Sequence, residues 1–332
     1  MHSTLALMIV IVVLALLFDF INGFHDTATV VATSITTRAL SPTIAIGMCA
    51  LFNFIGAFTS TAVAKTVGDG IVDSKHMPLW VIAAVLVAAI LWNLLTWWFA
   101  IPSSSTCALI GALVGGGIAI SKSFGAIGWG VLFNKFILWI FLSPLIGFTV
   151  GFILIVVLKQ FLKKAKPQKM NKLFKRFQIV SGILIALDHG ANDSQKSMGI
   201  ITMSLISGGF LGSFNVPIWV VVLCATAMGL GTLVGGKKII KTMGNKVTKI
   251  DPMGGFVAQL SSSIVLFVAT RLHAPVSTTQ VMTSSLMGIG SEKSLKRVNW
   301  GMAKQIVAAW VITIPAAALL AYVIVAVIHM FV

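Results

Sequence analysis

Long apolar segments dominate this chain, so it must adopt a fold that satisfies its backbone polar groups inside lipid. A membrane-spanning helix needs about 20 apolar residues, so the chain has room for roughly ten spans with short connections. Its 332 residues are only 10% charged, with a mean hydropathy of +1.01. These values exclude an ordinary soluble enzyme, a disordered chain and a soluble nucleic-acid binder. We predict an all-α polytopic membrane protein with about 10–12 membrane segments. The apolar segments are 4–21, 43–64, 79–101, 107–120, 130–158, 178–205, 215–235, 254–271, 277–290 and 303–331.

The densest cluster of charge separates the first five apolar segments from the last five. Lys159–Arg176 contains eight Lys or Arg residues and no acid. Because cytoplasmic loops are rich in Lys and Arg, we predict a cytoplasmic linker at 159–177. The net charge of +16 then belongs to loops of a multi-pass cytoplasmic-membrane protein, not to a nucleic-acid interface. Five segments per half place both termini outside. The same count places further basic residues inside: Lys237, Lys238, Lys241, Lys246, Lys249, Lys293, Lys296 and Arg297.

The two halves of the chain repeat each other. The matching pairs are Gly23–Asp26 with Gly190–Asp193, Lys65–Gly68 with Lys241–Gly244, Pro102–Thr106 with Pro275–Thr279, and Trp139 and Pro144 with Trp310 and Pro315. Four matches in one order, at nearly one offset, predict repeats at 1–158 and 178–332. An odd number of crossings in each half makes these repeats inverted, an architecture typical of transporters. The short segments 107–120 and 277–290 are predicted to be broken or re-entrant half-helices.

The first repeated motif is acidic. Carboxylates at membrane depth are costly and usually functional. We predict that the glycine before each acid breaks its helix, and that the freed carbonyls join carboxylate and amide oxygens in a hard-cation site. For either motif alone, helix capping by aspartate is the alternative. The predicted cation-coupling residues are Asn22, Asp26, Asn53, Asn192, Asp193 and Gln259, with Asp26 and Asp193 as Na⁺ ligands. For Asn53 and Gln259, simple hydrogen bonding between helices is an equal alternative.

The second repeated motif is rich in hydroxyl groups. Ser103, Ser104, Ser105 and Thr106 follow a proline and open one short apolar segment, and Ser277, Thr278 and Thr279 open the other. Hydroxyls and free backbone N–H groups at a helix N-terminus favour an anion. We therefore predict a binding site for a small oxyanion. An ordinary helix N-cap is the alternative, since serine and threonine are preferred there.

Three ionisable residues beside the acidic motifs have open roles. His25 and His189 are candidates for a proton relay, and a hydrogen-bonded structural histidine is the alternative for each. Lys196 either offsets the charge of a bound anion or faces water between spans.

At these motifs the sequence resembles the inorganic phosphate transporter (PiT) family, and its short linker resembles the compact bacterial members. The resemblance rests on Gly23–Ala28, Gly190–Lys196, Pro102–Thr106 and Pro275–Thr279, and extends over nearly the whole chain. It implies phosphate symport driven by Na⁺ or H⁺, inverted repeats and a homodimer. It also implies that the acidic motifs couple the cation and that the Ser/Thr segments hold phosphate. We add Asn192 and Gln195 to the phosphate-binding set.

We therefore predict a secondary phosphate transporter that works by alternating access, with no cofactor and with Na⁺ or H⁺ as the coupling ion. A metal–phosphate complex is a further form that the substrate could take. The nearest alternative is a permease for sulfate or a related oxyanion with the same fold. A passive anion channel is a weaker alternative. The sequence has neither a His-Glu-x-x-His zinc motif nor a Gly-x-Ser-x-Gly nucleophile turn, so we predict that the protein is not an enzyme.

Overall fold

The computed structural model describes residues 2–72, 77–99, 101, 103–234 and 250–331, which form a bundle of helices. The described residues contain no strand beyond a single bridge between Val72 and Ile127, so the all-α prediction is confirmed. The helices are α1 (His2–Thr36), α2 (Pro42–Gly56), α3 (Ala62–Gly70), α4 (Leu79–Trp98), α5 (Ser105–Ser121), η2 (Phe124–Ala126), α6 (Trp129–Val131), the π-helix η3 (Leu132–Ile137), α7 (Leu138–Phe161), α8 (Pro167–Ser207), α9 (Ile218–Val234), α11 (Pro252–Arg271), α12 (Thr278–Lys293), η4 (Leu295–Arg297) and α13 (Trp300–Ile328).

Five helical stretches of the described chain are long and apolar enough to cross a membrane. They are Thr4–Thr36, Leu79–Trp98, Trp129–Phe161, Pro252–Arg271 and Ala303–Ile328. The predicted half-helices 107–120 and 277–290 correspond to α5 and α12, which have only 17 and 16 residues. At about 1.5 Å per residue, each is shorter than the roughly 30 Å hydrocarbon core. The total of 10–12 membrane segments stays a prediction.

Glycines allow helices from the two halves of the chain to pack closely. α5 packs against α13, and α12 packs against α7. A Cβ atom on Gly115 would lie 2.0 Å from the Ala318 carbonyl oxygen, and one on Gly288 would lie 2.2 Å from the Phe148 carbonyl oxygen. Small residues of this kind are the usual means of tight helix packing in membranes. The two halves are therefore interleaved, and each half-helix is braced by a long helix of the other half.

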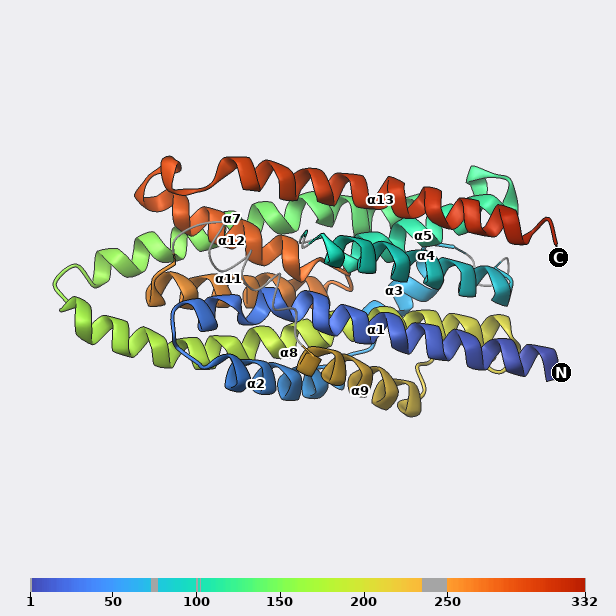
Figure 1. The fold of residues 1–332 in the computed structure, drawn as a ribbon, viewed down its shortest axis with the longest axis horizontal. Coiled ribbons are helices and arrows are strands. Elements are labelled where there is room, and N and C mark those ends of the chain that lie inside the picture. The colour runs from blue at the N-terminus through green and yellow to red at the C-terminus, as the bar shows by residue number, and fades with distance from the viewer. Residues whose placement is uncertain (1, 73–76, 100, 102, 235–249, 332) are drawn as a thin grey trace.

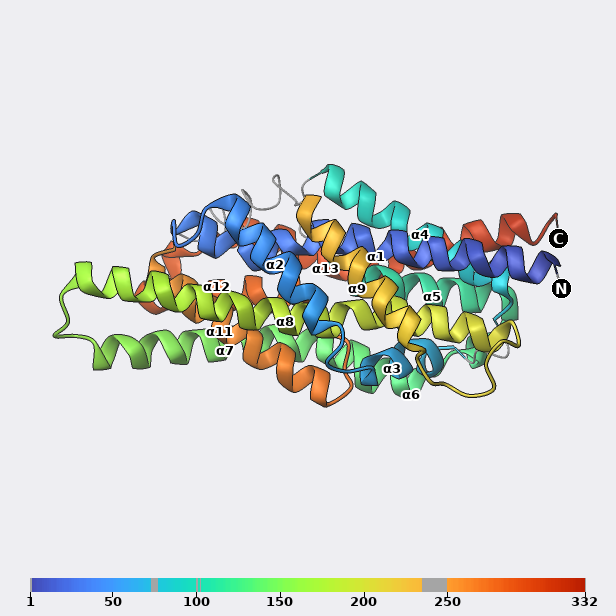
Figure 2. The same ribbon diagram turned by 90° about the horizontal axis from the view of Figure 1, so that it is seen from below.

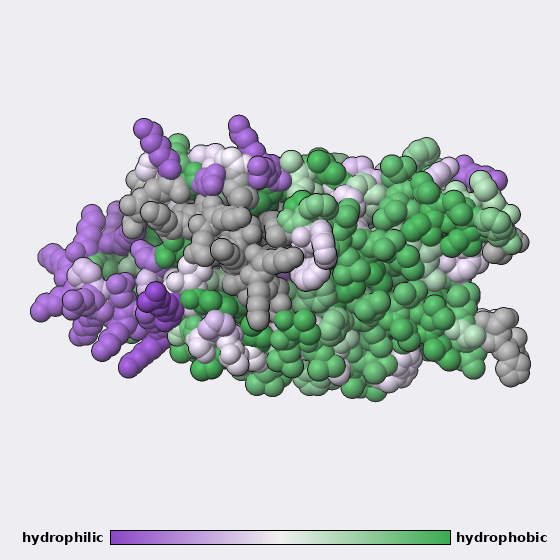
Figure 3. Space-filling view, in the orientation of Figure 1, coloured by the Kyte–Doolittle hydropathy of each residue, from purple (hydrophilic) through white to green (hydrophobic). Residues whose placement is uncertain are grey.

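The α7–α8 hairpin projects from one end of the bundle, and both termini lie at the opposite end (Figures 1 and 2). On the face shown in Figure 3, hydrophilic side chains gather at the hairpin end and apolar side chains cover most of the remainder. The basic linker thus lies at the opposite end of the molecule from the termini. This arrangement is the one expected if linker and termini lie on opposite sides of a membrane.

The basic linker is mostly helical. It forms the end of α7 and the start of α8, with the connection between them at 162–166. Pro167 at the first turn of α8 suits a helix start, where its missing N–H costs nothing. The division into 1–158, 159–177 and 178–332, and the inverted relation of the repeats, stay predictions. Pro102 and the segment 235–249, with its predicted inside lysines and the match to Lys65–Gly68, lie outside the described residues.

Candidate functional site

Both acidic motifs lie inside unbroken helices, so the predicted helix breaks at Gly23 and Gly190 are wrong. The two glycines are instead points of close helix contact. A Cβ atom on Gly23 would lie 2.5 Å from the Met228 carbonyl oxygen of α9, and one on Gly190 would lie 2.1 Å from the Asn53 carbonyl oxygen of α2. Because α1 and α8 stay helical, their carbonyls at the motifs are engaged in helix hydrogen bonds. Side chains therefore supply most of the polar atoms of the site.

Asp26 on α1 connects the acidic motif to both half-helices. Its Oδ2 accepts a hydrogen bond from the Ser105 hydroxyl at 2.8 Å, and its Oδ1 accepts one from the Thr279 hydroxyl at 3.0 Å. Ser105 Oγ also lies 2.7 Å from Asn22 Oδ1, so its one hydroxyl hydrogen is shared between these two acceptors. Asp26 is only 2% exposed. The structure thus brings together the acidic motif of the first half and the hydroxyl motifs of both halves around one carboxylate.

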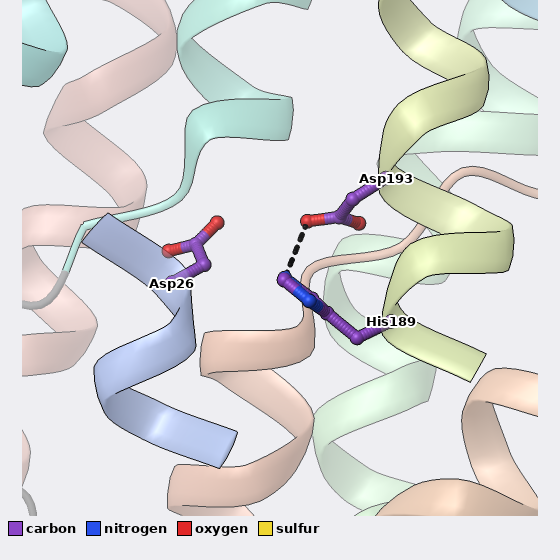
Figure 4. A group of neighbouring side chains, drawn as sticks. All are labelled: Asp26, His189 and Asp193. Atoms are coloured by element: carbon purple, nitrogen blue, oxygen red, sulfur yellow. Dashed lines mark ion pairs between the residues drawn. The ribbon is translucent and has the colours of Figure 1, made fainter. Parts of the chain in front are cut away.

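Asp193 on α8 lies near Asp26, and Figure 4 shows the two carboxylates, from α1 and α8, facing one another. Lys196 Nζ donates to Asp193 Oδ1 at 2.7 Å, and His189 Nε2 lies 3.3 Å from Oδ2. Asn22 Nδ2 lies 3.4 Å from the same Oδ2 and bridges α1 to α8. One ligand atom from each of Asp26, His189 and Asp193 lies within 4.8 Å of the others. Two carboxylates and an imidazole at this spacing can hold a cation.

Each half-helix begins with a capping residue, as the N-cap alternative predicts, and also has a hydroxyl that contacts the acidic motif, while oxyanion binding stays a prediction. Ser104 caps α5 by accepting from Cys107 N at 3.2 Å, and Ser277 caps α12 by accepting from Gln280 N at 3.4 Å. Ser105 and Thr279, in the first turns of α5 and α12, instead donate their hydroxyls to Asp26. Capping and site formation are therefore performed by neighbouring residues of each motif.

The remaining hydroxyls of the two motifs have different surroundings. Ser103 donates to the Thr96 hydroxyl of α4 at 2.7 Å, and Thr106 donates to the Val276 carbonyl at 3.1 Å. The buried Thr278 hydroxyl has no hydrogen-bond partner within the described part of the chain. Of these three, only Thr278 has its hydroxyl available to a ligand without breaking a bond.

Asn192 and Gln195 brace the polypeptide around the cluster. Asn192 Nδ2 donates to the Thr270 hydroxyl at 3.0 Å, and its Oδ1 accepts from Val276 N, just before α12. Gln195 Oε1 accepts from Val63 N at 2.6 Å and Ala64 N at 3.2 Å, and its amide also donates to the Ala191 carbonyl. Their direct contact with phosphate stays a prediction. The contacts present here position α3 and the start of α12.

Asn53 extends the cluster, whereas Gln259 bonds elsewhere. Asn53 Oδ1 lies 3.1 Å from His189 Nδ1, and its amide donates to the Thr232 hydroxyl of α9 at 2.9 Å. Gln259 on α11 donates to the Ser34 hydroxyl and accepts from the Ser181 hydroxyl, both at 2.8 Å. Hydrogen bonding between helices therefore describes the surroundings of Gln259. Asn53 fixes the ring of a histidine that contacts Asp193.

The structure also distinguishes the surroundings of the three ionisable residues with open roles. Lys196 is 1% exposed and ion-paired with Asp193, so it does not face water. His25 Nδ1 lies 2.9 Å from Asp26 Oδ1, and both histidines are buried. Each histidine thus adjoins one of the two acids.

Two further residues of this region were absent from the predicted site. Thr232 connects the two halves because the Thr27 hydroxyl donates to its hydroxyl at 2.9 Å. Asp19 is fully buried on α1, seven residues before Asp26. That spacing is two helical turns, which puts both acids on nearly the same face. The spacing could have identified Asp19 from sequence, whereas Thr232 belongs to no repeated motif.

Comparison with known proteins identifies the family. A model described as the phosphate transporter family matches residues 22–321. The "Probable low-affinity inorganic phosphate transporter" of Bacillus subtilis (strain 168) is 50% identical over 323 residues, covering 96% of each chain. The protein of the same name in Rhizobium meliloti (strain 1021) is 47% identical over 324 residues, again covering 96% of each.

A solved structure entitled "The sodium-dependent phosphate transporter" has the same fold. Its TM-score is 0.88 at 21% identity, with 98% of this chain and 100% of that chain covered. The relatives are transporters, which confirms the prediction that this protein is not an enzyme. The resemblance seen in the sequence motifs is likewise confirmed. This chain belongs to the phosphate transporter family.

Proposed function

We propose that this protein imports inorganic phosphate by cation-coupled symport and alternating access. The observation that carries the proposal is the geometry of Asp26, whose carboxylate accepts one hydroxyl from each half-helix. These hydroxyls and the N-termini behind them are also the natural partners of an oxyanion. One carboxylate therefore occupies the hydrogen-bond donors that phosphate would use.

A cation would release these donors. Na⁺ held by Asp26, His189 and Asp193 draws on the same carboxylate oxygens that accept from Ser105 and Thr279. It also cancels negative charge that would otherwise repel phosphate at close range. Phosphate could then accept hydrogen bonds from Ser105, Thr279 and the unpaired Thr278 hydroxyl. Cation and anion would therefore bind together more tightly than either does alone, which is the basis of symport.

The surroundings of Asp26 favour phosphate over sulfate. Protonated phosphate can donate a hydrogen bond to a carboxylate, and sulfate cannot. A sulfate ion beside Asp26 or Asp193 would leave a carboxylate and an anion facing each other without a shared proton. Sulfate transport is therefore the alternative that the transport assay must test.

Packing of equivalent helices supports alternating access by inverted repeats. α1 packs against α9 and α8 against α2, while α5 packs against α13 and α12 against α7. Each pair joins one helix from each half, and each has a counterpart in which the halves exchange roles. We place the linker in the cytoplasm, both termini outside and the protein in the cytoplasmic membrane. The homodimer and transport as a metal–phosphate complex belong to the same proposal.

The test is phosphate uptake into proteoliposomes under an imposed Na⁺ gradient or pH gradient, with excess unlabelled sulfate as a third arm. Asp193→Asn keeps the size of the side chain and removes its charge, so we expect cation-dependent accumulation to fall at least tenfold. The matched control is Asp188→Asn, an acid on the same helix that accepts from Ser263. Asp193→Asn with unchanged uptake and cation dependence would refute the coupling role. If sulfate abolishes phosphate uptake and is itself accumulated, the substrate assignment is wrong.

A further inference from the structure

A row of buried hydroxyls on α1 leads from the central cluster toward the linker end of the bundle. Thr29, Thr33 and Thr37 follow Asp26 at spacings of three or four residues, so this α1 hydroxyl row lies on one face of the helix. At about 1.5 Å per residue, the row extends roughly 16 Å from Asp26 along α1 (Figure 1). All three threonines are buried, and the Thr33 hydroxyl has no hydrogen-bond partner among the described residues.

Neighbouring helices face the α1 hydroxyl row with polar side chains. Thr29 Oγ1 lies 3.5 Å from Thr279 Oγ1 of α12, at the central end of the row. Further along, Gln259 of α11 bonds to Ser34 of α1 and to Ser181 of α8. Polar groups from four helices therefore join the central cluster to the linker end of the bundle.

Gln178 of α8 ties three helices together at the linker end of the row. Its Oε1 accepts from the Thr37 hydroxyl of α1 at 2.6 Å, and its Nε2 donates to the Pro252 carbonyl at the start of α11 at 3.0 Å. A Cβ atom on Gly255 would lie 1.7 Å from this Nε2, so the glycine provides the room that the amide occupies. Gln178 is 0% exposed. This one side chain therefore closes the row among the described residues.

The equivalent positions on the other side of the central cluster, toward the termini, are apolar. The residues that occupy the places of Thr33, Gln178 and Gln259 in the other half, counted from the matched motifs, are Ile200, Ile11 and Leu86. All three are 0% exposed and belong to one apolar cluster. An unpaired charge in such surroundings is strongly unfavourable, so an oxyanion has no path there in this structure.

We infer that phosphate leaves toward the cytoplasm along the α1 hydroxyl row, and that Gln178 closes this path in the present structure. The inference rests on the proposed phosphate transport and on the proposed cytoplasmic place of the linker. Hydroxyl groups donate hydrogen bonds to a passing oxyanion and carry no positive charge that would retain it. The linker side is closed by hydrogen bonds of one amide, whereas the opposite side is closed by apolar packing. The linker side is therefore the one that opens from this state.

Chemical accessibility of Thr33 tests the path. We would measure how fast an anionic, membrane-impermeant methanethiosulfonate reagent modifies Thr33→Cys in sealed membrane vesicles of each orientation. The native cysteines of the full-length chain, all buried, are first replaced by alanine. We expect modification from the linker side, slowed by saturating phosphate and Na⁺. The matched control, Ile200→Cys, should not react from the linker side. No reaction of Thr33→Cys from the linker side, or equal reaction of both variants there, overturns the inference.

Two further variants test the closing role of Gln178. Gln178→Ala should raise the rate of Thr33→Cys modification from the linker side about tenfold, the equivalent of one lost hydrogen bond. Gly255→Ala should give a similar increase, because the new methyl group displaces the Gln178 amide. The two changes together should do no more than either alone, since both remove one contact. The control is Gly47→Ala, whose Cβ would meet no atom within 4 Å. Unchanged rates in Gln178→Ala and Gly255→Ala overturn the assignment of Gln178.

Phosphate efflux covers the case in which Thr33→Cys does not fold. Vesicles that contain Gln178→Ala should release preloaded phosphate several-fold faster than vesicles with the wild-type protein, and unchanged efflux overturns the inference. Failure of the proposed function gives a different result. If the protein does not transport phosphate, Thr33→Cys still reacts from the linker side and Gln178→Ala still speeds the reaction, but phosphate no longer slows it.

Discussion

Replacing Lys196 by methionine should strengthen cation binding at the central cluster and weaken phosphate binding. Lys196 Nζ lies 2.7 Å from Asp193 Oδ1, and a Na⁺ on that carboxylate lies about 2.4 Å from its oxygen. The ammonium group and the cation are then at most about 5 Å apart. With an effective dielectric constant of about 20, their repulsion is about 3 kcal/mol. Removing it corresponds to roughly 100-fold tighter Na⁺ binding.

Phosphate should respond in the opposite direction. Lys196 is the one Lys or Arg side chain that is buried among the described residues, and it is paired with Asp193 of the cluster, so its loss removes positive charge from the surroundings of the proposed oxyanion site. We expect the apparent Kd for phosphate at saturating Na⁺ to rise at least tenfold. Isothermal titration of purified Lys196→Met with Na⁺, and then with phosphate at saturating Na⁺, measures both effects. Lys135→Met is the control, because Lys135 donates to the Leu272 carbonyl and contacts no acid of the cluster.

The two opposite shifts separate electrostatics from misfolding. A misfolded variant loses affinity for both ions, whereas the loss of one charge raises one affinity and lowers the other. If Lys196→Met binds Na⁺ no more tightly than wild type while it remains folded, the reasoning about the cluster is wrong. The cation would then bind away from Asp193.

Two further predictions concern stability. Gly231→Ala should lower the unfolding free energy by about 1–3 kcal/mol, because its Cβ would lie 2.0 Å from the Phe20 carbonyl oxygen. The control is Gly229→Ala, which should cost little stability because the atom nearest to its Cβ would be 3.5 Å away. Equal thermal denaturation midpoints for the two variants would contradict this prediction. Asn93→Leu should raise the midpoint with unchanged phosphate uptake, since both amide atoms of Asn93 are buried without partners in the described structure and such groups cost about 1–3 kcal/mol. A lower midpoint for Asn93→Leu would show that the amide has a favourable partner.

The half-helices were predictable from sequence because two independent signals agree. Segments 107–120 and 277–290 are too short to span a bilayer, and each begins with capping residues. The structure places Ser104 and Ser277 at these caps. Segment length and capping are local properties, so both can be recognised from the sequence of one segment alone.

The continuity of α1 and α8 was not predictable in the same way. Glycine before an acid is compatible with a helix break and with a helix crossing, and the choice depends on the neighbouring helix. Here Gly23 is covered by α9, and Gly190 is covered by α2. A helix covered so closely keeps its own hydrogen bonds, since a broken turn would leave buried backbone groups without partners. The spacing of residues within one helix does not reveal which other helix packs against it.

The two repeated acidic motifs make different contacts. Asp26 lacks a lysine three residues later, because Thr29 stands where Lys196 follows Asp193. Asp26 therefore accepts the hydroxyls of both half-helices, while Asp193 accepts from Lys196 and from Asn22 of α1. The carboxylate without an ammonium partner is the one free to exchange its hydroxyl donors for a cation. A duplicated sequence has thus given one acid bound to the hydroxyls of both half-helices and one acid bound to a fixed positive charge, and the proposed coupling uses both.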